Sequence, residues 1–431
     1  MNCLIEFFSD NKQKDLRRLA QNQSESYEDA LEIYKKLFIS YFSQIKEKCD
    51  EKKCNIDNNC DKFKKAILDI KIKDIKSFFD NMKKIYIFWI DAKVKDSLEL
   101  FIKTMDDYRL WDFYDNDIKK DIFFKGRIDK NILTKWEMFH IPFNKRYLIK
   151  NQRYSLTGQP IVYLGKSILD IMEELDIDEE NIGDLKISCV KIKGDLKVYD
   201  LRSDIYKILN KREFFSLFED NEQNDYQKEF FKIILASICS FERRKEHKDY
   251  TFCEEYVIPQ ILAQTLKNKS YDGVVYYSTK KFNEVKFFNI NKDLESKKDI
   301  IIKESYNINK NNKYKENIAL FTNFNKEHVY DEELYKKLEI SSPINFSKVQ
   351  NYKIKDLENI CKKIEKTKHK NNIYRSQVIL EIFKREFESI TINENNYSDI
   401  NIGKMHIYHL YCILNQILCE CAGCENEFIS E

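Results

Sequence analysis

Apolar side chains recur at helical spacing through the first quarter of the chain. After Ser26, with Glu28 and Asp29 in the first turn, they lie three or four residues apart, which is the period of an amphipathic helix. This stripe contains Leu31, Tyr34, Leu37, Phe38, Tyr41, Phe42 and Ile45, and a second stripe contains Val94, Leu98, Ile102 and Met105. Residues 1–112 contain no glycine or proline, so we expect a helical N-terminal domain there.

The pattern changes from about residue 113, where short strand-like runs alternate with helices. Gly158 and Pro160 favour a turn before the apolar run Ile161–Leu164, which has the composition of a strand. Gly165 is expected to end this strand, and Ser167 suits the N-terminus of the next helix. The apolar face of that helix contains Ile168, Ile171, Met172 and Leu175.

Further elements are expected in the same part of the chain. Strand-like runs on either side of Gly194 and Asp195 predict a β-hairpin. A helix is expected to begin near Pro259, and the strand Val274–Tyr277 to follow a turn at Gly273. We also expect helical structure over 203–240, a strand over 283–290 and a polar, exposed connection over 291–317.

These elements together predict an α+β fold in three parts. They are a helical N-terminal domain over 1–112, a mixed domain over 113–300 and a helical C-terminal extension over 301–431. The extension ends in an apolar stripe of Leu410, Ile413, Leu414 and Ile417. A length of 431 residues agrees with two or three domains.

Composition narrows the class of protein. The 74 basic residues nearly balance the 72 acidic ones, and the net charge of +2 argues against a protein that covers phosphate backbones, so nucleic acid is not an expected partner. The N-terminus lacks the pattern of a signal peptide, and no apolar run has membrane-spanning length. The 12 cysteines are therefore interpreted as reduced thiols of a cytoplasmic protein without a membrane partner.

Two cysteine clusters are candidate metal sites, and one charged run is a candidate ribonuclease motif. Cys49, Cys54 and Cys60 lack the close pair of a zinc knuckle, and Cys419, Cys421 and Cys424 with His406 and His409 suit helical surface and core positions better, so no metal is expected. The run ERRKEH at residues 242–247 is one residue short of the arginine–histidine spacing of helical HEPN ribonucleases. It is interpreted as a solvated charge run.

Four segments of the central region resemble the RES family, which is named for arginine, glutamate and serine residues that its members share. In order, they are FFKGRID, MFHIPFNKRYLIKNQRYSLTGQP, YLGKSILDIMEE, and YVIPQILAQ followed by SYDGVVYYS. The resemblance covers about residues 120–295. It implies a core of ADP-ribosyltransferase type with a mixed β-sheet, and an active site that consumes NAD. Family members are toxins that degrade NAD, some by phosphorolysis, and an antitoxin often neutralises them.

The resemblance also implies a set of site residues. The expected catalytic residues are Arg127, Tyr163, Glu174 and Ser278, and the expected NAD-binding residues are Lys125, Arg153, Tyr154 and Ser155. A guanidinium binds a pyrophosphate through two hydrogen bonds, so Arg127 is the first candidate for that role and Arg153 the second. A tyrosine face stacks on the flat, cationic nicotinamide, which suits Tyr163 with Tyr154 as a second wall.

Cleavage of the glycosidic bond builds positive charge on the ribose, which a carboxylate stabilises. Glu174 matches the family glutamate and is preferred over Glu173, which lies further from the apolar face of the helix. Ser278 suits a ribose hydroxyl or a phosphate oxygen. Lys125 stands where the family has an arginine, and a lysine loses the two-pronged contact with phosphate.

The leading hypothesis is an NAD-consuming enzyme that acts as a toxin or defence effector, by phosphorolysis with inorganic phosphate or by hydrolysis. A protein or nucleic-acid ADP-ribosyltransferase is the alternative within the same chemistry. The alternative of another class is a helical interaction module whose central domain is degenerate and non-catalytic, which Lys125 and the long flanks motivate. An antitoxin or regulatory protein and a homo-oligomer stay open as partners. Taken singly, each site residue more often has a structural role on a surface, in a core or in a turn.

Overall fold

The fold was analysed in a computed structural model of the whole chain. It describes residue 4 and residues 7–48, 65–111, 117–166, 168–177, 184–202, 222–247, 251–279 and 316–343. The chain divides into two compact units, each built from separate segments. The first contains Met1–Phe113, Tyr147–Gln159 and Lys197–Thr279, and the second contains Tyr114–Arg146, Pro160–Leu196 and Lys280–Glu431. The first segment ends beside the boundary expected at residue 112, and the three-part division itself stays a prediction.

Helices and strands confirm a mixed α+β fold. Seven strands are described: β4 and β5 pair in parallel in the first unit, and the other five form an antiparallel sheet in the second. The first unit contains α2 (Asp10–Asn22), α3 (Tyr27–Lys48), α5 (Ile72–Ile90), α6 (Val94–Asp107), α11 (Glu222–Ile238), α12 (Val257–Asn268), β4 (Val198–Asp200) and β5 (Gly273–Tyr277). The second contains β1 (Ile122–Ile128), α7 (Lys135–Phe139), β2 (Ile161–Gly165), α8 (Ile168–Glu174), β3 (Leu185–Ile192), β6 (Glu316–Phe321), α15 (Glu332–Lys336) and β7 (Leu338–Ile340). No described helix is long and apolar enough to cross a membrane.

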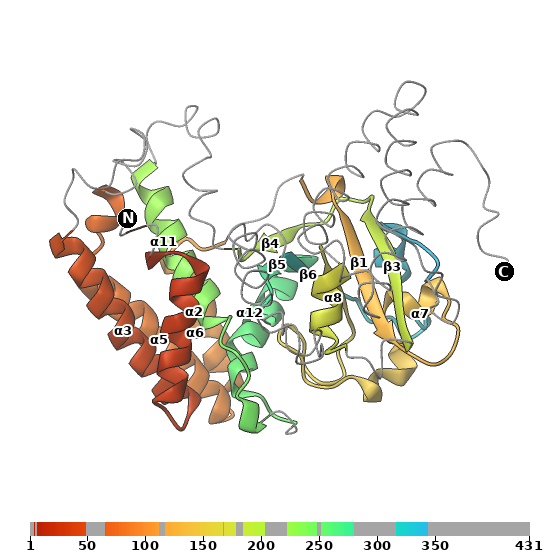
Figure 1. Cartoon of the computed structure of the whole chain (residues 1–431), viewed down its shortest axis with the longest axis horizontal. Coiled ribbons are helices and arrows are strands. Elements are labelled where there is room, and N and C mark those ends of the chain that lie inside the picture. Colours follow the sequence, from red (N-terminus) through yellow and green to blue (C-terminus); the bar gives the residue numbers. More distant parts are fainter. Residues whose placement is uncertain are drawn as a thin grey trace, which may run out of the picture. The chain divides into compact units, whose positions relative to one another are not determined.

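Figure 1 shows the helices of the first unit, which pack around aromatic side chains. The first predicted stripe is confirmed as the inner face of α3, where Leu31, Tyr34, Phe38 and Phe42 are buried. The ring of Phe38 lies 5.6 Å from that of Phe79 and 5.9 Å from that of Phe230, which brings α3, α5 and α11 together. The buried face of α3 could be predicted from the sequence because its buried side chains are all apolar or aromatic.

The second predicted stripe gave the right helix but only part of its buried face, since Met105 is buried and Leu98 and Ile102 are only partly buried. In α6 the buried residues are Ser97, Phe101, Thr104 and Met105, while Val94 is exposed. Two hydroxyl groups lie on the buried face because each finds a backbone acceptor. Ser97 Oγ donates to the carbonyl oxygen of Ile85 at 2.8 Å, and Thr104 Oγ1 donates to that of Leu100 at 2.8 Å.

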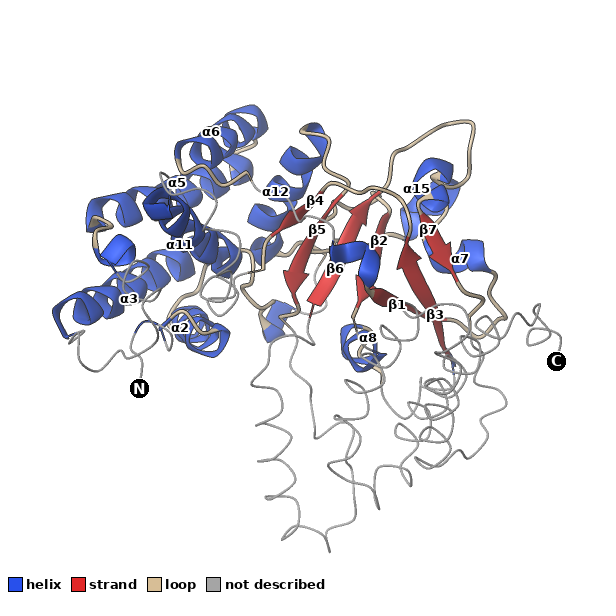
Figure 2. Cartoon of the chain, turned by 90° about the horizontal axis from the view of Figure 1, so that it is seen from above, coloured by secondary structure: helices blue, strands red, loops and turns tan. Residues whose placement is uncertain are grey.

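In the second unit five strands run antiparallel in the order β6-β2-β1-β3-β7. Both faces are covered. The β-carbon that a side chain at Gly126 would add meets Ile171 and Leu175, so α8 packs directly on one face, here called the α8 face. Arg127 Nη1 donates to the carbonyl oxygen of Glu137 at 3.0 Å, which places α7 on the other face, here called the α7 face. Figure 2 shows α8 and α15 on opposite sides of these strands.

The central strand and helix of the sequence analysis are confirmed as β2 and α8. The strand was expected to end before Gly165, but it includes this residue, which pairs with Asn317 of β6. A β-carbon at Gly165 would come within 2.9 Å of Ile171 Cδ1, so the position has no room for a side chain. The helix preceding β5 is also confirmed, although it begins at Val257 rather than Pro259. Ser167 lies outside the described residues.

Two expectations about strands are wrong. The runs around Gly194 form β3 and β4, but they are not a hairpin: β3 pairs with β1 and β7, and β4 pairs in parallel with β5. The region over 316–340 was expected to be a polar connection and then helical, yet it contributes β6 and β7, with every residue of β6 buried. The expected strand over 283–290, the C-terminal stripe and both cysteine clusters lie outside the described residues.

Candidate functional site

The predicted site residues fall into two groups. Lys125, Arg127, Tyr163 and Glu174 belong to the second unit, whereas Arg153, Tyr154, Ser155 and Ser278 belong to the first. Each group is therefore considered within its own unit.

Strand register separates the four predicted residues of the second unit into two pairs. Directly opposed residues on antiparallel strands point to the same face of a sheet, and successive residues of a strand point to opposite faces. Phe124 on β1 lies opposite Gly165 on β2. Tyr163, two residues before Gly165, is therefore on the α8 face. Lys125 and Arg127, one and three residues after Phe124, are on the α7 face.

Glu174 lies at the end of α8, where its carboxylate contacts a strand of the sheet. Its Oε1 accepts a hydrogen bond of 2.9 Å from Nδ2 of the buried Asn317 on β6. Asn317 lies opposite Gly165, so it belongs to the same face as Tyr163. Tyr163 and Glu174 are both partly exposed. The α8 face thus combines an aromatic ring with a carboxylate whose orientation is fixed by an amide, which are two of the groups that the sequence predicted.

The two cations on the α7 face already hold structural contacts. Besides its bond to Glu137, Arg127 Nη2 lies 3.6 Å from Oδ2 of Asp129. Lys125 Nζ donates to the carbonyl oxygen of Tyr163 at 3.4 Å. Burial and the guanidinium of Arg127 lower the pKa of Lys125 to about 8. The structure therefore does not place either cation on the face that carries Glu174.

Lys125→Met is expected to raise the free energy of unfolding at pH 7 and to flatten its dependence on pH. The ammonium has a pKa of about 8 in the folded protein against 10.5 for a free side chain, so the unfolded chain binds more protons between these values and wild-type stability rises with pH there. Below pH 8 the penalty reaches at most about 3 kcal/mol. Urea unfolding between pH 7 and pH 10 measures this, with the exposed Lys130→Met as control. An unchanged pH slope in Lys125→Met would contradict the assignment.

In the first unit, Arg153 is a partly buried cation that holds structural contacts. Its Nη1 donates to the carbonyl oxygen of Cys239 at 2.6 Å, and its Nη2 donates to that of Phe241 at 2.9 Å and to Thr279 Oγ1 at 3.1 Å. The guanidinium also lies 4.9 Å from the ring centre of Tyr256. These contacts occupy the donors that a pyrophosphate would need.

Tyr154 and Ser155 belong to the same turn and are both buried. The ring of Tyr154 packs against that of Tyr276 at 4.5 Å, and Ser155 Oγ donates to Gln152 Oε1 at 3.1 Å. Gln260 on α12 holds the turn, because its Nε2 donates to the carbonyl oxygens of Gln152 at 2.8 Å and Ser155 at 3.0 Å. The turn that contains Tyr154 and Ser155, expected to bind NAD, is therefore joined to α12 through Gln260.

Ser278 follows the end of β5 and is buried. It lines a cavity of about 20 Å³ together with residues of α2 and α11. A water molecule needs about 10–15 Å³ of such space, so this cavity does not hold a whole dinucleotide.

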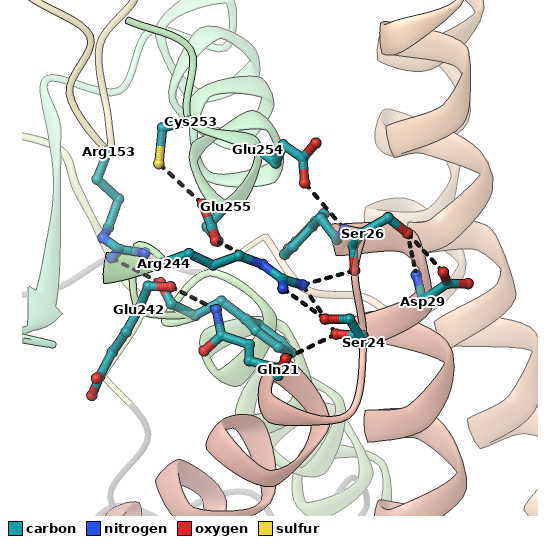
Figure 3. A network of polar contacts seen from close by, with 12 residues as sticks. Gln21, Ser24, Ser26, Asp29, Arg153, Glu242, Arg244, Cys253, Glu254 and Glu255 are labelled. Atoms are coloured by element: carbon teal, nitrogen blue, oxygen red, sulfur yellow. Dashed lines mark hydrogen bonds and ion pairs between the residues drawn. The ribbon is translucent and has the colours of Figure 1, made fainter. Parts of the chain in front are cut away.

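The charged run at residues 242–247 was expected to be solvated, and this expectation is wrong. Much of the run makes hydrogen bonds with other parts of the first unit. Arg244 Nη1 donates to the carbonyl oxygen of Ser24 at 2.7 Å, and its Nη2 donates to that of Ser26 at 3.0 Å. Gln21 Nε2 donates to the carbonyl oxygen of Glu242 at 2.6 Å. Figure 3 shows this network between the turn after α2 and the segment that includes Arg244. A run of alternating charges gives no sign in the sequence that backbone carbonyls will surround it.

Within the described part of the chain, no group of three or more histidine, cysteine, aspartate or glutamate side chains could hold a metal ion. The described cysteines Cys189, Cys239 and Cys253 form no disulfide. Burial raises the pKa of Cys239 and of Cys253 to about 12, so both are protonated at neutral pH.

Comparison with known proteins gave one relative. The chain is 29% identical over 230 residues to a protein of Bacillus subtilis (strain 168) named "Putative toxin YopC". The alignment covers 50% of this chain and 51% of the relative, so the chain spans about half the length of the curated relative that it matches. No family model and no solved structure matches the chain.

Proposed function

We propose that this protein is a toxin that cleaves the nicotinamide–ribose bond of NAD. Similarity to the protein named "Putative toxin YopC" supports the first part of the proposal. The observation that carries the second part is the α8 face, where Tyr163 and a carboxylate oriented by Asn317 share one side of the sheet. An aromatic face and a fixed carboxylate are the two groups that departure of nicotinamide requires.

Each group has a defined task in this reaction. The ring of Tyr163 stacks on the nicotinamide and orients it as the leaving group. As the glycosidic bond lengthens, positive charge grows on the ribose, and the carboxylate of Glu174 stabilises that charge. Asn317 acts as a positioning residue, because its amide holds the carboxylate without supplying a charge. An acceptor then attacks the ribose carbon from which nicotinamide left.

The acceptor decides the product. Inorganic phosphate gives ADP-ribose phosphate, water gives ADP-ribose, and a side chain or nucleobase gives an ADP-ribosylated macromolecule. Phosphorolysis or hydrolysis is the leading form of the proposal, with transfer to a macromolecule as the alternative.

The experiment is to incubate the purified full chain with NAD and to quantify free nicotinamide by chromatography. We expect release, with ADP-ribose phosphate as the second product when phosphate is present. Equal release without phosphate indicates hydrolysis, and release only with a cell extract indicates a macromolecular acceptor. A folded protein that gives no nicotinamide in any of these conditions would favour the non-catalytic interaction module instead. Induced expression in bacteria, with cellular NAD measured before growth stops, tests the toxin role separately.

A further inference from the structure

Lys125 on the α7 face is a partly buried ammonium group that no described carboxylate pairs with. Its Nζ makes one hydrogen bond to the described residues, a long one of 3.4 Å to the carbonyl oxygen of Tyr163. The carboxylate of Asp129 lies within ion-pair distance of Arg127 instead. A cation removed from water is costly unless an anion balances it, so this lysine lacks a group that would stabilise it.

The groups around Lys125 add positive charge or none. Arg127 lies two residues further along β1, and Lys186, which is 5% exposed, lies directly opposite Arg127 on β3. The buried His140 is neutral, because burial lowers its pKa to about 4. Burial and Arg127 together keep part of the Lys125 amine neutral at physiological pH. A neutral lysine amine beside another cation is a nucleophile.

Ser188 is a second unsatisfied group on the same face. It lies directly opposite Lys125 on β3 and is fully buried. Its Oγ has no hydrogen-bond partner among the described residues. Buried polar groups are nearly always paired, so this hydroxyl lacks an acceptor. Opposed side chains on antiparallel strands have β-carbons about 4.5–5.5 Å apart, which makes Ser188 and Lys125 neighbours.

One small addition to Lys125 would satisfy both groups. A carboxylate attached to Nζ would replace the unbalanced positive charge with a negative one beside Arg127 and Lys186, and it would offer an acceptor to Ser188. The lysine side chain has four rotatable bonds, and its hydrogen bond of 3.4 Å is weak enough to give up. The side chain can therefore turn toward β3.

We propose that Lys125 is a site of carboxylation by carbon dioxide, with the resulting carbamate held by Arg127, Lys186 and Ser188. The lone pair of the neutral amine attacks the carbon atom of carbon dioxide, and a nitrogen–carbon bond forms. One carbon–oxygen π bond becomes a lone pair on oxygen, and the nitrogen releases one proton to water. The step needs no oxidant, reductant or further reactant.

This inference goes beyond the proposed function. The modified residue lies on the α7 face, whereas Tyr163 and Glu174 act from the α8 face, and neither NAD nor nicotinamide takes part. Failure of the test below therefore leaves the nicotinamide assay unaffected.

The test is to equilibrate the full chain at pH 8 with ¹³C-labelled carbon dioxide and bicarbonate, and then to trap carbamates by alkylation of their oxygen. Mass spectrometry of the digested protein locates the label. We expect at least about tenfold more label on Lys125 than on the exposed Lys130. About half of an amine with a pKa of about 8 is neutral at this pH, against less than about 1% of an ordinary lysine. Equal labelling of the two lysines would overturn the proposal.

The variants Arg127→Gln and Arg146→Gln form a matched pair, because each removes one arginine of the second unit and only Arg127 lies on β1. We expect Arg127→Gln to lower the labelling of Lys125 at least about fivefold, since it loses a cation that both favours the neutral amine and stabilises the carbamate. Arg146→Gln should change it less than about twofold. Ser188→Ala, a smaller change, should lower the labelling severalfold and covers the case in which Arg127→Gln fails to fold. Labelling that is unchanged in both Arg127→Gln and Ser188→Ala would refute the assigned contacts.

Thermal unfolding separates carboxylation from the binding of an exchangeable anion. A group bound only to the folded protein raises the melting temperature. We expect dissolved carbon dioxide and bicarbonate to raise it in the wild type and not in Lys125→Met, with no comparable rise from chloride or phosphate at equal ionic strength. An equal rise with phosphate, without label on Lys125, would mean that the cations take up a free anion and that the proposal is wrong.

Discussion

Replacing Glu174 with glutamine is expected to lower the rate of nicotinamide release at least about 100-fold, which corresponds to ~2.7 kcal/mol of transition-state stabilisation. Glutamine has the same shape and keeps an oxygen that accepts from Asn317 Nδ2, so the end of α8 should hold its position. Only the negative charge is lost. NAD affinity should change little, because the charge on the ribose develops after binding.

The matched control is Glu173→Gln on the same helix. Glu173 is only 7% exposed, so the expectation that it lies further from the apolar face than Glu174 is wrong. Glu174 is partly exposed at the helix end and contacts β6. We expect the Glu173 variant to keep most of its turnover. If Glu173→Gln loses nicotinamide release and Glu174→Gln does not, the catalytic carboxylate is Glu173. Initial rates at saturating NAD and binding measured by calorimetry, with circular dichroism to check folding, separate these outcomes.

Arg153→Met is expected to lower the free energy of unfolding by about 3 kcal/mol. The variant keeps an apolar side chain of similar length but leaves the carbonyl oxygens of Cys239 and Phe241 without their donor, at a cost of about 1–3 kcal/mol for each buried group. It also loses the contact with the ring of Tyr256. Urea unfolding followed by fluorescence measures the change.

The control for this variant is Arg146→Met, which removes an exposed arginine that lies over the ring of Phe324. Its effect should stay within about 0.5 kcal/mol, as is usual for a surface substitution. The sequence assigned Arg153 to NAD binding. Unchanged stability together with weaker NAD binding in Arg153→Met would restore that role and contradict the structural one.

Local patterns predicted α3, β2, α8 and β5, since each is defined by its own residues and their caps or turns. Strand pairing is set by residues far apart in the chain, and this is where the sequence analysis failed. The apparent hairpin around Gly194 has a turn residue in the right place, yet β3 finds its partners in β1 and β7. The apolar run of β6 was missed because a long polar segment precedes it.

Strand pairing also decides which residues of the candidate site lie together. The sequence named Lys125, Arg127, Tyr163 and Glu174 among the residues of one active site, and nothing in their order along the chain says which strands pair or in which register. The pairing of Phe124 with Gly165 decides that the cations and the Tyr163–Glu174 pair lie on opposite faces. The cavity near Ser278 could not be predicted from the sequence either, because part of its lining comes from α2, more than 200 positions earlier in the chain.

The network around Arg244 has a consequence for the order of events during synthesis. The turn after α2 is held by side chains that are made some 220 positions later, and Tyr27 N donates to Glu254 Oε2 in the same way. The N-terminal helices therefore emerge from the ribosome long before their partners exist. Folding of the second unit can be completed only later still, since β6 and β7 come after residue 315. We expect a nascent chain to acquire the proposed activity only after β7 has been made, so that an early, partial product would not harm the cell that makes it.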